Sequence, residues 1–156
     1  MKKIVLTGAA GRLGSHLREP LSKMANQLVS TDLADEIGIL YAGESYVKAD
    51  LASLDQMIDL LKDADMVVHF GAIGDEAPFD AILQSNIVGA YNVWEAAYKN
   101  GVRRVVYASS IHAVGMHPKN EFIGTDAPHR PDTYYGLAKC FAEDLASLYW
   151  DKRGVE

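Results

Sequence analysis

Short apolar runs alternate along this chain with longer segments in which apolar residues recur at helical spacing. Three of the short runs, at 4–6, 66–68 and 105–107, are apolar without a break, which is expected of parallel strands covered on both faces. The strands that the pattern predicts are 3–7, 27–31, 44–48, 65–70 and 103–108. The alternation of strands and helices predicts one α/β domain over residues 1–156, with a doubly wound parallel sheet and helices on both faces.

Four segments are predicted as helices. The first carries one apolar stripe, formed by Leu13, Leu17, Leu21 and Met24. Pro20 falls inside this helix and predicts a kink or an early end. Ser53 and Gln56 form a capping box that opens the second helix, which runs to about residue 62. The third helix is predicted over 78–100 and the fourth over 133–152.

The turn between the first strand and the first helix is rich in glycine. Residues 7–14 read TGAAGRLG. Gly8 allows a tight turn, Gly11 lets the backbone approach a pyrophosphate, and Gly14 lets helix and strand pack closely. The free N–H groups at the start of the helix would then face the phosphates. Glycines in this strand–turn–helix setting predict a dinucleotide-binding site of the Rossmann type.

Residues at the ends of later strands extend this site. Asp32 stands 18 residues after Gly14, where its carboxylate can accept a hydrogen bond from a ribose 2′-hydroxyl and repel a 2′-phosphate. This favours NAD over NADP, although a surface aspartate that starts a turn would look the same. Asp50 is either an adenine contact or a solvated residue before the helix cap at Ser53. The predicted cofactor residues are Gly8, Ala10, Gly11, Arg12, Leu13, Gly14, Asp32, Leu33, Asp50, Leu51, Gly71, Ala72, Tyr135 and Lys139.

A tyrosine and a lysine one helical turn apart are the strongest sign of catalysis. A phenol has a pKa near 10, and an ammonium held close to it favours the phenolate. At about 100° per residue, Tyr135 lies roughly 40° from Lys139 around the helix axis, whereas Tyr134 lies about 140° away. We therefore predict Tyr135 as the base and Tyr134 as a packing or substrate-wall residue.

Ser110 and Asn86 complete the predicted catalytic residues. Ser110 follows the fifth strand at the carboxyl edge of the sheet, where open α/β folds bind their ligands. Its hydroxyl can hydrogen-bond a substrate oxygen, while one of Ser109 and Ser110 is expected only to form a turn. Asn86 lies within a helix, where its propensity is poor. Its side chain either faces solvent, braces the backbone or takes part in a buried relay.

These motifs resemble the extended, epimerase-like branch of the short-chain dehydrogenase/reductase superfamily. The residues that carry the resemblance are, in order, 7–14, Asp32, Asn86, Ser110, Tyr135 and Lys139. It implies hydride transfer to NAD, with Ser110 orienting the substrate, Tyr135 as acid and base, and Lys139 also holding the nicotinamide ribose. The 78–100 helix is apolar in too many directions for one stripe. With the 133–152 helix it could form the dimer bundle typical of this branch, so a homodimer is expected.

A narrower resemblance is to the bacterial uronate dehydrogenase family, through segments 84–89, 108–115 and 135–141. It implies oxidation of glucuronate or galacturonate at C1 to an aldarolactone. His112 matches the family's substrate histidine, although a structural histidine bonded to backbone would look the same. The chain differs from the family at two substrate contacts. Ile111 stands where the family has an asparagine, and Gly74 stands where it has a serine. The substrate residues implied are Gly74, Ser110, Ile111 and His112.

The resemblance covers essentially all 156 residues but only somewhat more than half of the family's usual length. Since 17 residues follow Lys139, the C-terminal substrate region is expected to be absent and the fifth strand to be an open edge. Two other functions stay open: a sugar-nucleotide epimerase or dehydratase, and a truncated NAD-binding module without activity. Against the dehydratase, the Thr-Asp-Glu run usual beside the catalytic serine is missing at 111–113.

Composition changes this picture little. The formal net charge of −6, with no basic cluster along one helix, argues against nucleic acid as a partner. The longest apolar runs are too short to span a bilayer, and residues 1–8 are typical of a strand entering a turn rather than of an export signal. The single Cys140 excludes an internal disulfide and is compatible with a reducing compartment. We expect a cytoplasmic protein without a metal site, whose partners are NAD and a sugar acid.

Overall fold

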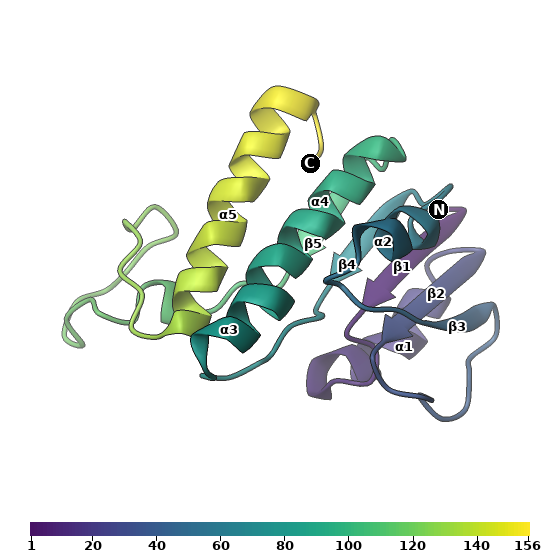
Figure 1. The fold of residues 1–156 in the computed structure, drawn as a ribbon, viewed down its shortest axis with the longest axis horizontal. Coiled ribbons are helices and arrows are strands. Elements are labelled where there is room, and N and C mark those ends of the chain that lie inside the picture. Colours follow the sequence, from purple (N-terminus) through teal and green to yellow (C-terminus); the bar gives the residue numbers. More distant parts are fainter.

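A parallel five-stranded sheet forms the centre of the computed structural model, which describes residues 1–156 (Figure 1). The strands are β1 Lys3–Thr7, β2 Gln27–Asp32, β3 Glu44–Lys48, β4 Met66–His69 and β5 Arg104–Tyr107. They lie in the order β3-β2-β1-β4-β5, and every neighbouring pair is parallel. The predicted α/β fold is confirmed. The strand order reverses between β1 and β4, which is where open α/β sheets bind their ligands.

Helices cover both faces of this sheet. They are α1 Arg12–Ser22, α2 Leu54–Leu60, α3 Phe79–Ile82, α4 Gly89–Lys99 and α5 Tyr134–Arg153, with a π-helical segment η1 Leu83–Val88 and a 3₁₀ turn η2 Ile111–Ala113. On one face, Val5 and Val67 pack with residues of α2, α4 and α5, which lie in front of the sheet in Figure 1. On the other face, Ile4 and Leu6 pack with Leu21 of α1. Successive residues of β1 are therefore buried on opposite sides, which explains its unbroken apolar run.

The outer strand β5 is covered on one face only. Val105 and Tyr107 pack against the core under α4 and α5, whereas Val106 is 43% exposed. On this face α1 packs against β1 and β2, and β4 separates these strands from β5. The prediction that residues 105–107 are covered on both faces is therefore wrong.

The outer edge of β5 is paired over its first residues. The N–H of Glu156 donates to the carbonyl of Arg103 at 2.9 Å, and the N–H of Val105 donates to the carbonyl of Glu156 at 2.8 Å. Val155 is buried in the larger core, and the Glu156 carboxylate pairs with Arg103 and Arg104. The expectation of an open edge is therefore wrong for this part of β5.

Both long predicted helices form, and the first of them contains a π-helical segment. The predicted 78–100 helix is one continuous helical run whose middle, η1, is π-helical, and this segment carries Asn86. The α5 helix begins after Thr133, whose hydroxyl oxygen accepts from the N–H of Gly136 at 2.8 Å. It ends at Gly154, which adopts the left-handed conformation with φ 71° that closes many helices.

The first helix, α1, continues to Ser22 and so ends two residues beyond Pro20, in keeping with an early end. Its predicted apolar stripe is wrong at both extremes, because Leu13 and Met24 are 61% and 52% exposed. The buried residues of α1 are Gly14, Arg18 and Leu21. The Arg18 guanidinium is satisfied by the Glu44 carboxylate at 2.7 Å and by two backbone carbonyls. No helix of the chain is both long enough and apolar enough to cross a membrane.

Candidate active site

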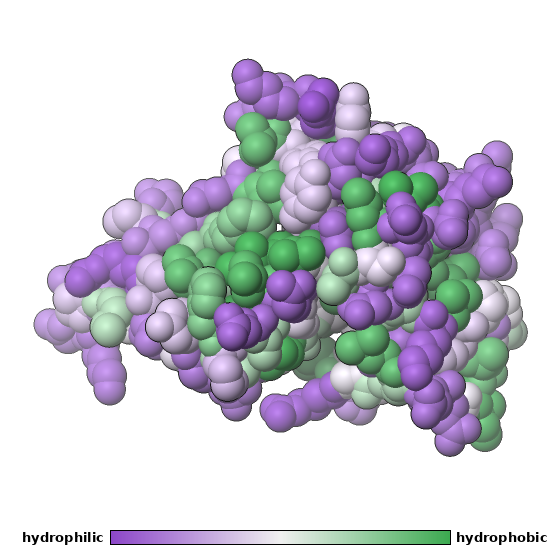
Figure 2. Space-filling view, in the orientation of Figure 1, coloured by the Kyte–Doolittle hydropathy of each residue, from purple (hydrophilic) through white to green (hydrophobic).

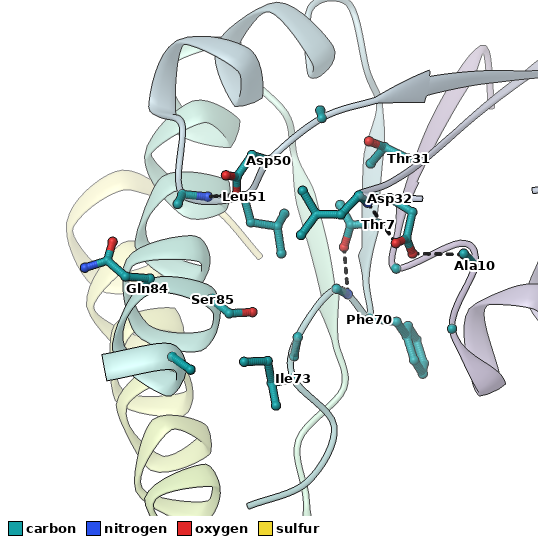
Figure 3. Close-up of a pocket in the computed structure, with 18 residues that line it drawn as sticks. Thr7, Ala10, Thr31, Asp32, Asp50, Leu51, Phe70, Ile73, Gln84 and Ser85 are labelled. Atoms are coloured by element: carbon teal, nitrogen blue, oxygen red, sulfur yellow. Dashed lines mark hydrogen bonds between the residues drawn. The ribbon is translucent and has the colours of Figure 1, made fainter. Parts of the chain in front are cut away.

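A cavity of about 530 Å³ opens at the carboxyl ends of β1, β2 and β4 (Figure 3). Nine of its 18 lining residues were predicted as cofactor contacts: Gly8, Ala10, Gly11, Asp32, Leu33, Asp50, Leu51, Gly71 and Ala72. The other five predicted contacts do not line it: Arg12, Leu13 and Gly14 belong to the start of α1, and Tyr135 and Lys139 belong to α5. Nine lining residues were not predicted: Thr7, Thr31, Ala49, Ala52, Phe70, Ile73, Ala81, Gln84 and Ser85.

Glycine is required in this cavity wall by backbone contact rather than by flexibility alone. Gly8 has φ +73°, and a Cβ atom there would lie 2.6 Å from the backbone N of Gly71. A Cβ atom on Gly14 would lie 1.9 Å from the carbonyl oxygen of Gly8. The β1–α1 turn is therefore pressed against both the end of β4 and the first turn of α1. This close approach leaves a backbone wall without side chains, which a pyrophosphate can approach closely.

The Asp32 carboxylate, at the end of β2, binds the β1–α1 turn. One of its oxygens accepts from the N–H of Ala10 at 2.9 Å, and the other accepts from the N–H of Leu33 at 2.8 Å (Figure 3). The hydroxyl of Thr31, a buried residue that lines the same cavity, has no hydrogen-bond partner within the chain. An acceptor-only carboxylate, a buried hydroxyl and a glycine-lined wall fit the ribose and phosphates of a dinucleotide.

A buried histidine at the end of β4 supports the cavity wall through Thr7. The Thr7 hydroxyl oxygen accepts from the N–H of Gly71 at 3.0 Å and lies 2.7 Å from Nδ1 of His69. Burial lowers the pKa of His69 to about 3, so the imidazole is neutral at physiological pH. This chain of hydrogen bonds holds Gly71 in the cavity wall.

Lys139 and Tyr135 lie together at the start of α5. The Lys139 side chain is 3% exposed, and Nζ donates to the carbonyl of Ala108 at 2.7 Å. Nζ lies 5.2 Å from the centre of the Tyr135 ring and 4.6 Å from that of Tyr107. Burial lowers the pKa of Lys139 to about 8. Tyr134 is half exposed and packs against Phe79 instead, so it is Tyr135 that lies beside the lysine.

The turn after β5 brings Ser110 and His112 to the same place. Ser110 precedes η2, and its hydroxyl oxygen accepts from the N–H of His112 at 3.3 Å. The His112 ring meets the Tyr135 ring edge-on, with 5.8 Å between their centres. Ile111 is 81% exposed and turns away from these contacts. The neighbouring Ser109 bonds outward to Glu143, which distinguishes the two serines.

Two carboxylates that the sequence did not single out organise this end of the site. Glu76 accepts from the N–H groups of Tyr134 and Tyr135 at 3.2 and 3.0 Å and so caps the first turn of α5. Asp132 lies 2.8 Å from Nδ1 of His112. Glu76 is 59 residues from Tyr135, and no local signal could have paired them. For Asp132 a weak signal existed, because acidic residues are favoured just before a helix.

Asn86 braces the loop after β4. It is 3% exposed; its Oδ1 accepts from the N–H of Ile73 at 2.9 Å and its Nδ2 donates to the carbonyl of Ile73 at 3.0 Å. The alternative that it faces solvent is excluded, and the backbone-bracing alternative describes its contacts. Gly74 follows Ile73 in this loop and is exposed, with open space where a Cβ atom would lie.

The fold and this arrangement define a dinucleotide-binding domain in which Ser110, Tyr135 and Lys139 are held by the turn after β5 and the start of α5. The chain belongs to the NAD dependent epimerase/dehydratase family, whose model matches residues 4–156.

Among its relatives, the chain is 46% identical to a uronate dehydrogenase of Agrobacterium fabrum over 156 residues, covering 100% of this chain and 58% of the relative. It is 33% identical to an L-arabinose 1-dehydrogenase (NAD(P)(+)) of Haloferax volcanii, covering 100% of this chain and 64% of the relative. A mutant uronate dehydrogenase of Agrobacterium tumefaciens complexed with NAD superposes with a TM-score of 0.95 at 44% identity, over 99% of this chain and 58% of that one. The chain thus spans somewhat more than half the length of the uronate dehydrogenases it matches.

Proposed function

We propose that this chain forms the NAD-binding and proton-transferring part of a dehydrogenase that oxidises a hexuronate, glucuronate or galacturonate, at C1 to an aldarolactone. The observation that carries the proposal is that Tyr135 contacts both Lys139 and His112, and that His112 is bonded to Ser110. The likeness to uronate dehydrogenases, one of them complexed with NAD, supports the substrate class and the cofactor.

In this proposal the cofactor is held by the cavity wall and the Asp32 carboxylate, which accepts from ribose hydroxyls. When bound, NAD supplies the acceptor for the hydride that leaves C1. A 2′-phosphate would meet the Asp32 carboxylate, so NAD is favoured over NADP. Asn86 and the Thr7–His69 pair keep the β4 end of the cavity in place for the nicotinamide side.

The chain's own side chains then move one proton. The Ser110 hydroxyl hydrogen-bonds the C1 oxygen of the sugar, and Tyr135 takes the proton of the C1 hydroxyl. Such a general-base step is worth about 10²–10⁴ in rate. Lys139 is buried and cationic at neutral pH, since its pKa of about 8 lies above 7. In the proposed reaction this positive charge lies beside the phenol that exchanges the proton.

The direct test is an assay of NADH formation with glucuronate and with galacturonate, run beside a titration of the chain with NAD. We expect saturable NAD binding and NADH formation in the unaltered chain. Tyr135→Phe should lose NADH formation, while Tyr134→Phe, one residue away, should keep both NAD binding and NADH formation. Turnover that survives in Tyr135→Phe would refute the role of this tyrosine. Absence of NAD binding would refute the whole proposal.

A second candidate function is NAD binding without turnover of hexuronate. The observation that favours it is the charge around Tyr135. Glu76 and Asp132 place two carboxylates near it, and Lys139 is committed to the Ala108 carbonyl. An anionic sugar acid needs a cationic partner. Activity with a neutral aldose but not with a hexuronate would favour this charge argument over the uronate assignment.

We also infer a homodimer through residues 78–100 and 133–152. Apolar residues are gathered over α4 and α5, which lie side by side (Figures 1 and 2). Two exposed residues lie on the same face of each helix: Tyr91 and Tyr98 on α4, and Leu137 and Leu148 on α5. Light scattering at micromolar concentration should give twice the monomer mass, and Leu148→Glu should halve it. The matched control is Ile39→Glu, at an exposed residue far along the chain from both helices. A monomeric mass for the unaltered chain would refute the dimer.

A cytoplasmic setting is part of the same proposal. The single cysteine, Cys140, is buried and its sulfur donates to the carbonyl of Ala113. Such a thiol is stable in a reducing compartment, where sugar-acid oxidation with NAD would take place.

A further inference from the structure

Asp132 stands out among the residues around Tyr135 because its carboxylate is confined. It lies immediately before the N-cap residue of α5, and its Oδ1 is 2.8 Å from Nδ1 of His112. The Thr133 hydroxyl donates to the same oxygen at 3.3 Å. On the other side, a Cβ atom on Gly115 would lie 2.2 Å from Oδ2. The carboxylate therefore fills the space that a larger residue at 115 would need.

The chemistry of this contact fixes where the imidazole proton lies. The hydrogen bond from His112 lowers the pKa of the Asp132 carboxyl below its usual value, so Asp132 is ionised at neutral pH. An ionised carboxylate only accepts hydrogen bonds, so Nδ1 of His112 must carry a proton. In a neutral imidazole, Nε2 is then a bare acceptor. No hydrogen bond to Nε2 is made within the chain, and the ring stands edge-on to Tyr135.

We propose that Asp132 is a positioning residue: it accepts the Nδ1–H of His112 and thereby presents Nε2 as an acceptor for a substrate hydroxyl beside Tyr135. The inference rests on the proposed function in naming the substrate a polyhydroxylated sugar. It deepens that function, since it says which kind of group His112 recognises. In this tautomer His112 accepts from a hydroxyl and cannot donate to a carboxylate through Nε2.

A purely structural tie between η2 and α5 is the competing explanation. Such a tie would stabilise the fold without depending on the tautomer of His112. A nearby pair offers a matched comparison, because His129 is bonded to Glu143 at 2.8 Å in the same kind of contact. No ring contact joins His129 to Tyr135, so removal of the Glu143 carboxylate should leave the tautomer of His112 unchanged.

The test is ¹⁵N NMR of the histidine-labelled chain at pH 8, where an ordinary imidazole is neutral, with signals assigned through His112→Gln. We expect His112 to carry its proton on Nδ1 in the unaltered chain. In Asp132→Ala the proton should move to Nε2. Gly115→Ala, which keeps the carboxylate but displaces it, should produce the same change, while Glu143→Ala should not. A His112 that is protonated on Nε2 or on both nitrogens in the unaltered chain would overturn the proposal, as would a tautomer unchanged in both variants.

Kinetics separates positioning from support of the fold. In Asp132→Ala we expect the KM for the sugar acid to rise about 5- to 10-fold, as the loss of one hydrogen bond implies, with the affinity for NAD unchanged. An unchanged KM for the sugar, or an equal loss of NAD affinity, would contradict the proposal. If the unaltered chain oxidises no hexuronate, the proposed function fails, and the NMR result still decides the position of the proton.

Discussion

The cofactor cavity and the Tyr135 end of the site are built by different means. Behind the cavity wall, backbone packs directly on backbone, as where Gly14 meets the carbonyl of Gly8, and there is no space for a side chain. At the Tyr135 end, side chains join segments that are distant in sequence, such as Glu76 to the first turn of α5 and Asp132 to His112. The first region is fixed by steric exclusion and the second by individual hydrogen bonds.

This difference predicts how each region responds to mutation. A substitution in the cavity wall must move backbone, so it should cost stability and NAD affinity together. A substitution at the Tyr135 end removes one contact at a time, so it should alter turnover or a local hydrogen bond while the cavity stays intact. Four changes test this contrast, in order of the size of the expected effect.

Tyr135→Phe removes the phenolic oxygen and should lower kcat by about 10²–10⁴, because the proton acceptor is lost. NAD affinity should change far less than kcat, since the ring is kept and the cavity lining does not include Tyr135. Initial rates of NADH formation and NAD titration measure the two effects, with Tyr134→Phe as the control. A parallel loss of NAD affinity would show that the two regions are not separable.

Gly14→Ala introduces a Cβ atom 1.9 Å from the Gly8 carbonyl oxygen. Overpacking against backbone should lower the free energy of unfolding by about 3 kcal/mol and weaken NAD binding as well. Gly74→Ala is the control, because open space surrounds that position. Urea unfolding of the three chains measures the change, and equal stability for Gly14→Ala and Gly74→Ala would refute the steric account.

Lys139→Met tests the buried cation through the pH dependence of stability. The pKa of Lys139 is about 8 in the folded chain, against an ordinary value of 10.5, so between these values the unfolded chain binds more protons. The free energy of unfolding of the unaltered chain should therefore rise relative to Lys139→Met as pH increases from 8 to 10.5, by at most about 1.4 kcal/mol per pH unit. Urea unfolding across this range measures it, and a constant difference between the two chains would contradict the lowered pKa.

Glu76→Ala removes the carboxylate that caps the first turn of α5. Loss of such a cap should cost about 1 kcal/mol of stability. Glu76→Gln keeps an acceptor oxygen but not the charge, so it should cost less. Thermal unfolding ranks the three chains. A Gln variant as unstable as the Ala variant would show that charge, rather than the hydrogen bonds to Tyr134 and Tyr135, is what matters.

The sequence allowed much of the first region to be predicted and less of the second. Glycine spacing and Asp32 identify the cavity because local backbone geometry demands those residues. Lys139 and Tyr135 were paired by helix periodicity, which is also local. Glu76 and Asp132 were missed because their partners are set by how distant segments pack. For the same reason, the exposure of Val106 and the π-helical turn around Asn86 could not be inferred from apolar patterning.

The central claim is that this chain folds a complete NAD cavity whose specificity depends on Asp32. Calorimetric titration with NAD and with NADP, on the unaltered chain and on Asp32→Ala, tests it most directly. We predict one saturable site that prefers NAD, with NAD affinity reduced about 10-fold or more in Asp32→Ala as charge-assisted hydrogen bonds are lost. Equal affinity for NAD and NADP, or no effect of Asp32→Ala, would contradict the account.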